Sequence, residues 1–235
     1  MPESSTLSPQ EASSELARIR DRVDSGDFDL RSLGFWKLVG GIKRDPELVD
    51  ACADEVGEID WLAFKAFAKV RFPVWVGNLV LAAGIAVGAA LIVVAREASE
   101  ELVAGLALVL AAGIWAVAVH SPTHWLVGRF VGLRFRCYFF GGPFPPRPGL
   151  KTDYASYLRC RPRNRAVMHA SGALATKAAP FVALIFWRGS GAPAWAAWVV
   201  LAIGIVQILT DVFLSTKSSD WKKVKRELAV ARAAG

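Results

Sequence analysis

The chain has 235 residues, of which 54% are hydrophobic and 21% charged, with a formal net charge of +7. This composition is too apolar for a disordered chain and unusual for a soluble domain. The apolar residues gather in runs longer than a soluble core helix needs, which indicates an integral membrane protein. Because the basic residues lie beside these runs, we interpret the charge as a topology signal and as contacts to anionic membrane lipids, with no role in nucleic-acid binding.

Residues 1–71 are predicted to form a helical region in the cytoplasm. Helical spacing of apolar residues runs from Ser14 to about Val23. A further helix is expected to begin near Pro46, because proline is tolerated in a first helical turn. The segment from Ile59 to Val70 has aromatic residues on one side and lysines on the other, so we expect it to lie against the membrane surface.

Four transmembrane spans are predicted within residues 72–216, at about 72–95, 102–127, 166–187 and 192–214. Each is long enough to cross a hydrocarbon core of about 30 Å, which takes roughly 20 helical residues. Residues 217–235 are expected to form a C-terminal helix in the cytoplasm. The predicted fold class is an all-α, polytopic membrane protein.

The orientation of the spans follows from the distribution of lysine and arginine. The segment from Arg129 to Arg165 is rich in arginine and contains a single acid, Asp153, whereas the two other connections contain one basic residue each, Arg96 and Arg188. The positive-inside rule places both termini and this middle segment in the cytoplasm. Two roles for the middle segment stay open: it covers a cavity in the bundle, or it is a rigid connector whose arginines meet lipid phosphates.

The histidines carry the main functional signal. His120 and His124 share a helix face and can take adjacent positions on one metal ion. A carboxylate is a suitable further ligand for zinc, and both Asp211 and Asp220 are candidates. Two other interpretations stay open: Asp220 caps the final helix, and Asp211 pairs with Lys177. The three cysteines form no C-x-x-C pair, so neither a disulfide framework nor a cysteine-based zinc site is expected.

Four short segments of the chain form a further pattern when they are taken in order. Residues 120–132 read HSPTHWLVGRFVG, residues 138–142 read YFFGG, residues 171–176 read SGALAT, and Asp220-Trp221 follows. In that order they resemble the H-E-x-x-H span, the glycine-pair loop, the small-Gly-Pro-x-x-Asn span and the Asp-Gly motif of the site-2 protease family of intramembrane zinc metalloproteases. The resemblance covers about residues 111–225. It implies a zinc site with His120, His124 and Asp220 as the metal ligands.

Ser121 stands where this family has the glutamate that serves as general base. A serine without an adjacent base cannot do this at neutral pH, and loss of a general base typically lowers the rate by about 10²–10⁴-fold. We therefore predict a divergent site-2 protease-like metalloprotein, a pseudoenzyme without ordinary peptidase activity. Asp211 is the candidate for a substitute catalytic base. Pro122 is expected to kink the second span.

Two other classes of function stay open. Two histidines and one carboxylate also suit non-haem iron with open positions, which would define a metal-dependent, lipid-modifying membrane enzyme. In the other class the protein is a non-catalytic scaffold that binds a transmembrane helix or a lipid, and His169, Lys177 and Asp211 are polar contacts between spans. The expected partners are membrane lipids and a transmembrane peptide that serves as substrate or partner.

Overall fold

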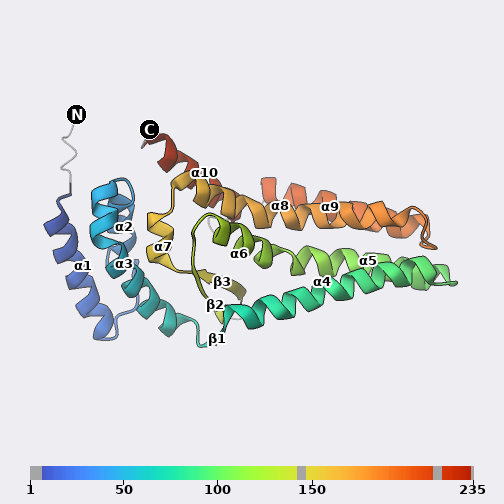
Figure 1. Ribbon diagram of the computed structural model, residues 1–235, viewed down its shortest axis with the longest axis horizontal. Helices are drawn as coiled ribbons and strands as arrows, with labels where there is room; N and C mark the ends of the chain where they lie inside the picture. Colours follow the sequence, from blue (N-terminus) through green and yellow to red (C-terminus); the bar gives the residue numbers. More distant parts are fainter. Residues whose placement is uncertain (1–6, 142–146, 214–218, 234–235) are drawn as a thin grey trace. The chain divides into compact units, whose positions relative to one another are not determined.

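The computed structural model describes residues 7–141, 147–213 and 219–233 (Figure 1). Three predicted features therefore lie outside the described residues: the second glycine of the glycine pair, the end of the fourth span at residue 214, and the last two residues of the C-terminal helix. The described chain forms two compact units. Unit 1 consists of Met1–Val74, Arg129–Pro162 and Ala229–Gly235, and unit 2 of Trp75–Gly128 and Arg163–Leu228.

The helices of unit 1 are α1 (Pro9–Asp24), α2 (Phe35–Ile42), α3 (Pro46–Phe67) and α7 (Tyr154–Arg159). α1 begins with a reciprocal capping box between Ser8 and Glu11. α3 begins at Pro46 as predicted, with the Asp45 side chain accepting hydrogen bonds from the first-turn backbone. The segment predicted from Ile59 is part of α3, because no breaker interrupts the helix before it. α1, α2, α3 and α7 share one hydrophobic core, whose largest buried side chains are those of Leu16, Ile19, Phe35, Ile42, Val56 and Ile59.

Unit 1 also contains a small antiparallel sheet that the sequence analysis did not predict. Its strands are β1 (Val70–Phe72), β2 (Phe135–Gly141) and β3 (Arg147–Thr152), paired in the order β1-β2-β3. The segment between Arg129 and Arg165 is therefore more than a loop or connector, since it supplies two strands and α7. The aromatic side chains of 135–140 favour this conformation. The fold class remains all-α, with these short strands as an addition.

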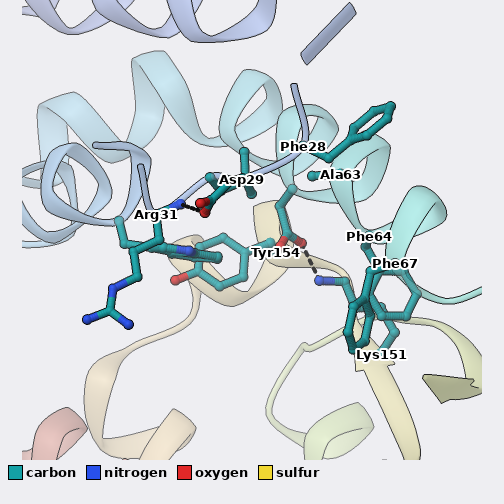
Figure 2. A pocket seen from close by; sticks show the side chains of 11 residues that line it. Phe28, Asp29, Arg31, Ala63, Phe64, Phe67, Lys151 and Tyr154 are labelled. Carbon is teal, nitrogen blue, oxygen red and sulfur yellow. Dashed lines mark hydrogen bonds and ion pairs between the residues drawn. The ribbon is translucent and has the colours of Figure 1, made fainter. Parts of the chain in front are cut away.

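A pocket of about 430 Å³ in unit 1 is lined mainly by aromatic side chains (Figure 2). An ion pair lies in its wall, with Lys151 Nζ 2.6 Å from Asp60 Oδ2. Lys151 also lies over the ring of Phe64, 4.6 Å from its centroid. Burial raises the pKa of Asp60 above its ordinary value, and the nearby Lys151 ammonium opposes this rise.

Because a buried carboxylate needs its partner, we expect Lys151→Met to destabilise the protein by about 3–5 kcal/mol at pH 8. The pKa of Asp60 in the folded state is raised and loss of Lys151 raises it further, so the loss of stability is full only at high pH and disappears once the pH falls below the folded-state pKa of Asp60 in the wild type. Thermal unfolding in detergent at pH 4 and pH 8 measures both values. The exposed Lys65 provides the control, since Lys65→Met should change stability little at either pH. A Lys151→Met loss equal at both pH values would contradict the account.

Unit 2 contains the predicted membrane spans. Four helical segments are long and apolar enough to cross a membrane: Val74–Glu97, Glu101–Phe130, Pro162–Trp187 and Ala194–Phe213. They correspond to α4 (Val74–Glu97), α5 (Glu101–Ala118) with α6 (His120–Phe130), α8 (Pro162–Trp187) and α9 (Ala194–Phe213). Only 17% of the most apolar 18-residue window is buried in α4, and the same share is buried in α9. These helices therefore expose apolar faces suited to lipid. The protein therefore has the architecture of a multi-pass membrane protein.

Small residues allow the helices of unit 2 to pack closely. A Cβ added at Gly88 of α4 would lie 2.3 Å from Nε1 of Trp115 on α5, and this indole nitrogen donates a 3.0 Å hydrogen bond to the carbonyl of Ile85. Close approach of backbones at such residues is a general feature of transmembrane helix pairs. Alanines dominate the shared core: Ala95, Ala104, Ala107, Ala111, Ala112, Ala183, Ala192 and Ala196.

The second span is interrupted at Val119, before the two histidines, whereas Pro122 was expected to kink it between them. α5 ends at Ala118 and α6 begins at His120. Pro122 therefore falls in the first turn of α6, where a missing backbone N–H is tolerated. The Thr123 hydroxyl donates a 2.7 Å hydrogen bond to the carbonyl of Val119 at the break. As a result, both histidines of the HSPTH motif lie in the first two turns of α6.

Candidate metal centre

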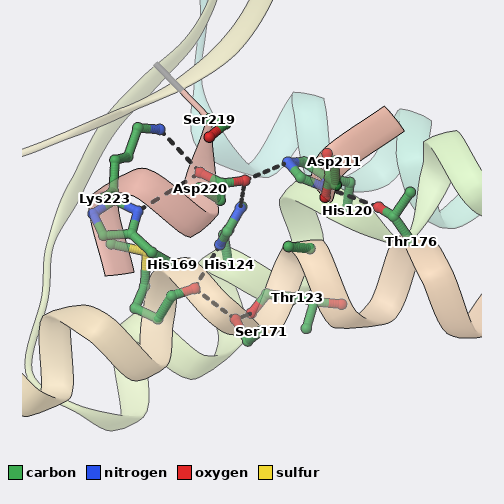
Figure 3. Close-up of polar contacts among 12 residues, drawn as sticks. His120, Thr123, His124, His169, Ser171, Thr176, Asp211, Ser219, Asp220 and Lys223 are labelled. Carbon is green, nitrogen blue, oxygen red and sulfur yellow. Dashed lines mark hydrogen bonds and ion pairs between the residues drawn. The ribbon is translucent and has the colours of Figure 1, made fainter. Parts of the chain in front are cut away.

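Three side chains of unit 2 meet at the start of α6 and of α10 (Asp220–Ala233) (Figure 3). Asp220 Oδ2 lies 3.2 Å from Nε2 of His124 and 3.4 Å from Nε2 of His120. The candidate ligand atoms of all three residues lie within 4.8 Å of one another. The structure thus brings together His120, His124 and Asp220, which the resemblance implies as ligands.

The hydrogen bonds of His124 orient its ring for metal binding. Nδ1 lies 2.6 Å from the carbonyl oxygen of Met168, which can only accept, so Nδ1 carries the proton. The neutral ring then presents the lone pair of Nε2 to the Asp220 carboxylate at 3.2 Å. Two acceptors at this distance require a proton or a metal cation between them. A histidine bonded to a backbone carbonyl through its second nitrogen is the usual arrangement at metal sites.

The spacing of these atoms fits zinc. Zn²⁺ binds nitrogen and oxygen ligands at about 2.0–2.1 Å in tetrahedral geometry, which places two ligand atoms about 3.3 Å apart. The two distances from Asp220 Oδ2, 3.2 and 3.4 Å, have this length. The chain thus offers two imidazoles and one carboxylate, a set that leaves one position of a tetrahedron free. This donor set could hold a metal ion and does not by itself identify which one.

Asp220 faces the two histidines and does not cap the final helix. Ser219 takes the capping role, since its hydroxyl accepts a 3.4 Å hydrogen bond from the backbone N–H of Lys222. Burial alone would raise the pKa of Asp220, but the contacts with the His120 and His124 side chains and the ammonium of Lys223 outweigh burial and lower this pKa. Lys223 Nζ lies 2.9 Å from Asp220 Oδ1, the carboxylate oxygen that does not face His124.

α8 contributes a stripe of small and polar residues against these ligands. Thr176 Oγ1 lies 2.9 Å from Nδ1 of His120, and His169 Nδ1 lies 3.8 Å from Asp220 Oδ1. A Cβ added at Gly172 would lie 2.4 Å from Nε2 of His124, so only glycine leaves room for this ring. Gly172 and Thr176 both belong to the SGALAT segment. The SGALAT segment of α8 thus lies against the candidate ligands.

The same stripe continues to an ion pair that the sequence analysis did not identify. Arg165 lies one helical turn before His169 on α8, and its Nε is 2.8 Å from Oε2 of Glu227 on α10. Both side chains are at most 1% exposed. Because Glu227 lies two turns after Asp220 on the same face of α10, the pair fixes this helix against α8 and thereby positions Asp220. The sequence signal for the role of Arg165 is its helical spacing from residues 169, 172 and 176, which places all four on one face of α8.

Asp211 is not brought into the cluster of metal ligands. Its carboxylate forms an ion pair with Lys177, so the structure supports the interpretation in which these two charges neutralise each other. The group of three candidate ligands in the described part of the chain does not include Asp211. The Asp211 carboxylate is thus engaged by the Lys177 ammonium, and its role as a substitute for the glutamate that Ser121 replaces stays a prediction.

The chain has no significant match among family models, curated proteins or solved structures. The class that the fold and the site define is therefore a four-span, all-α membrane protein with a His-His-Asp group able to hold a metal ion.

Proposed function

We propose that the protein is a divergent site-2 protease-like membrane metalloprotein that binds Zn²⁺ through His120, His124 and Asp220 and lacks ordinary peptidase activity. The observation that carries the proposal is the convergence of these three side chains from α6 and α10. His124 and Asp220 are 96 residues apart in the sequence. The proximity of Gly172 and Thr176 to the two imidazoles supports this proposal, since both residues belong to the SGALAT segment that resembles the family.

Zinc at this centre would supply Lewis-acid polarisation of a bound carbonyl or water. The chain's own residues hold and orient the ligands: Met168 fixes His124, Thr176 contacts His120, and Lys223 contacts Asp220. A general base must reach the proton that it removes. Ser121 at the glutamate position cannot supply one, and Asp211 is engaged by Lys177. The proposal is therefore metal binding without efficient peptide hydrolysis.

Metal analysis of the purified protein tests the proposal. We expect wild-type protein supplied with zinc to retain about one equivalent per chain. Loss of a residue that hydrogen-bonds a metal ligand typically lowers metal affinity by roughly 10–100-fold. His124→Ala and Asp220→Asn remove candidate ligands themselves and should lower zinc affinity by more than this. His169→Ala is the control, because His169 belongs to the same unit but is not among the three candidate ligands. Zinc content unchanged by the ligand substitutions would refute the proposal, and iron in place of zinc would favour the lipid-modifying alternative.

A non-catalytic scaffold is the second candidate, and the ion pair of Lys177 with Asp211 favours it. Charges within predicted spans are costly, and here they join α8 to α9 as the scaffold hypothesis expects. Absence of bound metal after zinc supply, together with non-additive losses of thermal stability in Lys177→Ala and Asp211→Ala, would favour the scaffold.

A further inference from the structure

A pocket of about 400 Å³ in unit 2 has a cationic lining that the metal centre does not use. Residues of α8, α9 and α10 line it, among them three lysines and one acid, Asp211. Asp211 is paired with Lys177. Lys222 and Lys225 are exposed, and neither forms an ion pair with any other residue that the structure describes. The pocket therefore has two positive charges available for an anionic ligand.

The pocket lies where lipid headgroups meet a membrane span. Asp211 and Val212 belong to the last turn of α9, a helix long and apolar enough to cross a membrane. Ile208 and Val212 line the pocket and are exposed, so the apolar surface of the span continues into it. Trp221 completes the lining, and tryptophan is enriched at membrane–water interfaces. The lining therefore combines apolar side chains with cationic ones.

We propose that this pocket binds the headgroup of an anionic phospholipid. Lys222 and Lys225 contact the phosphate, and the acyl chains follow the exposed face of α9 along Ile208 and Val212. Lys177 remains paired with Asp211 and lies 6.0 Å from the centre of the Trp221 ring. A volume of about 400 Å³ accommodates a headgroup, since ligand pockets generally span about 300–1,000 Å³. The inference does not depend on metal binding by the neighbouring centre.

Native mass spectrometry of the full chain in detergent tests this proposal. The protein is titrated with phosphatidylglycerol and with phosphatidylcholine of the same acyl chains. We expect preferential binding of phosphatidylglycerol to wild-type protein. The double variant Lys222→Gln/Lys225→Gln should lose about 30-fold in phosphatidylglycerol affinity, which corresponds to about 1 kcal/mol for each lysine near an anionic surface.

The matched control is Arg96→Gln/Arg188→Gln, which removes the same net charge from exposed positions in the last turn of α4 and in the α8–α9 connection. This control should retain the preference, and thermal unfolding shows that both double variants remain folded. Equal losses in the two double variants would overturn the proposal. Equal binding of phosphatidylcholine, or displacement of the lipid by equimolar inorganic phosphate, would also overturn it, because the pocket would then select no anionic lipid or would select the free anion.

Discussion

Gly172→Ala is expected to abolish metal binding at the candidate centre. The added Cβ would lie 2.4 Å from Nε2 and 2.5 Å from Cδ2 of His124, so the ring must leave its position. The ring cannot move without giving up the 2.6 Å hydrogen bond from Nδ1 to the Met168 carbonyl. We expect zinc affinity to fall by at least about 100-fold, the upper end of what loss of an outer-sphere partner costs. Overpacking should also destabilise the protein by about 1–3 kcal/mol.

The control for this substitution is Gly113→Ala on α5. No atom lies within 4 Å of a Cβ added at Gly113, so the change is sterically free. It should leave zinc affinity unchanged and stabilise the helix by up to about 1 kcal/mol. Isothermal titration with zinc and thermal unfolding measure the two effects. Normal zinc affinity in Gly172→Ala would show that His124 does not bind the metal in the orientation described.

Glu227→Ala is expected to cause a large loss of stability. It leaves the guanidinium of Arg165 buried without its carboxylate, and such losses are typically 3–5 kcal/mol. Because α10 also carries Asp220, zinc affinity should fall in the same variant. Thermal unfolding in detergent gives the first quantity and zinc titration the second. Arg226→Ala is the neighbouring control, since the Arg226 side chain is 62% exposed.

The double variant Arg165→Met/Glu227→Leu separates burial of charge from packing. Replacement of a buried ion pair by apolar residues of similar volume is often neutral or stabilising. We therefore expect it to recover most of the stability that Glu227→Ala loses. If Glu227→Ala were no less stable than Arg226→Ala, α10 would not be held by this pair.

The spans could be predicted because each is encoded by its own residues. A charge-free apolar run such as 72–95 is long enough to cross a membrane whatever it packs against. The strands β2 and β3 could not be predicted in the same way. They are short, they flank a segment rich in glycine and proline, and the pairing of β2 with β1 joins residues far apart in the sequence. The break near Pro122 was predictable because proline acts locally.

The site could be predicted only in part, because some of its contacts join residues far apart in the sequence. The spacing of His120 and His124 indicates a pair of ligands directly, because four residues make one helical turn. The choice between Asp211 and Asp220 depended on the family resemblance, since Asp211 lies in the last turn of the fourth span and Asp220 lies shortly after it. The pairing of Arg165 with Glu227 was hidden, because Arg165 resembles the other arginines of a positive-inside segment. Only the docking of α10 on α8 buries both charges.

X-ray absorption spectroscopy of the zinc-loaded protein tests the central claim most directly. The account predicts a zinc shell of two imidazole nitrogens and at least one carboxylate oxygen at about 2.0–2.1 Å, with no sulfur. Asp220→Asn should lose this spectrum. A sulfur shell at about 2.3 Å from the free cysteines, or a spectrum without imidazole scattering, would contradict the account.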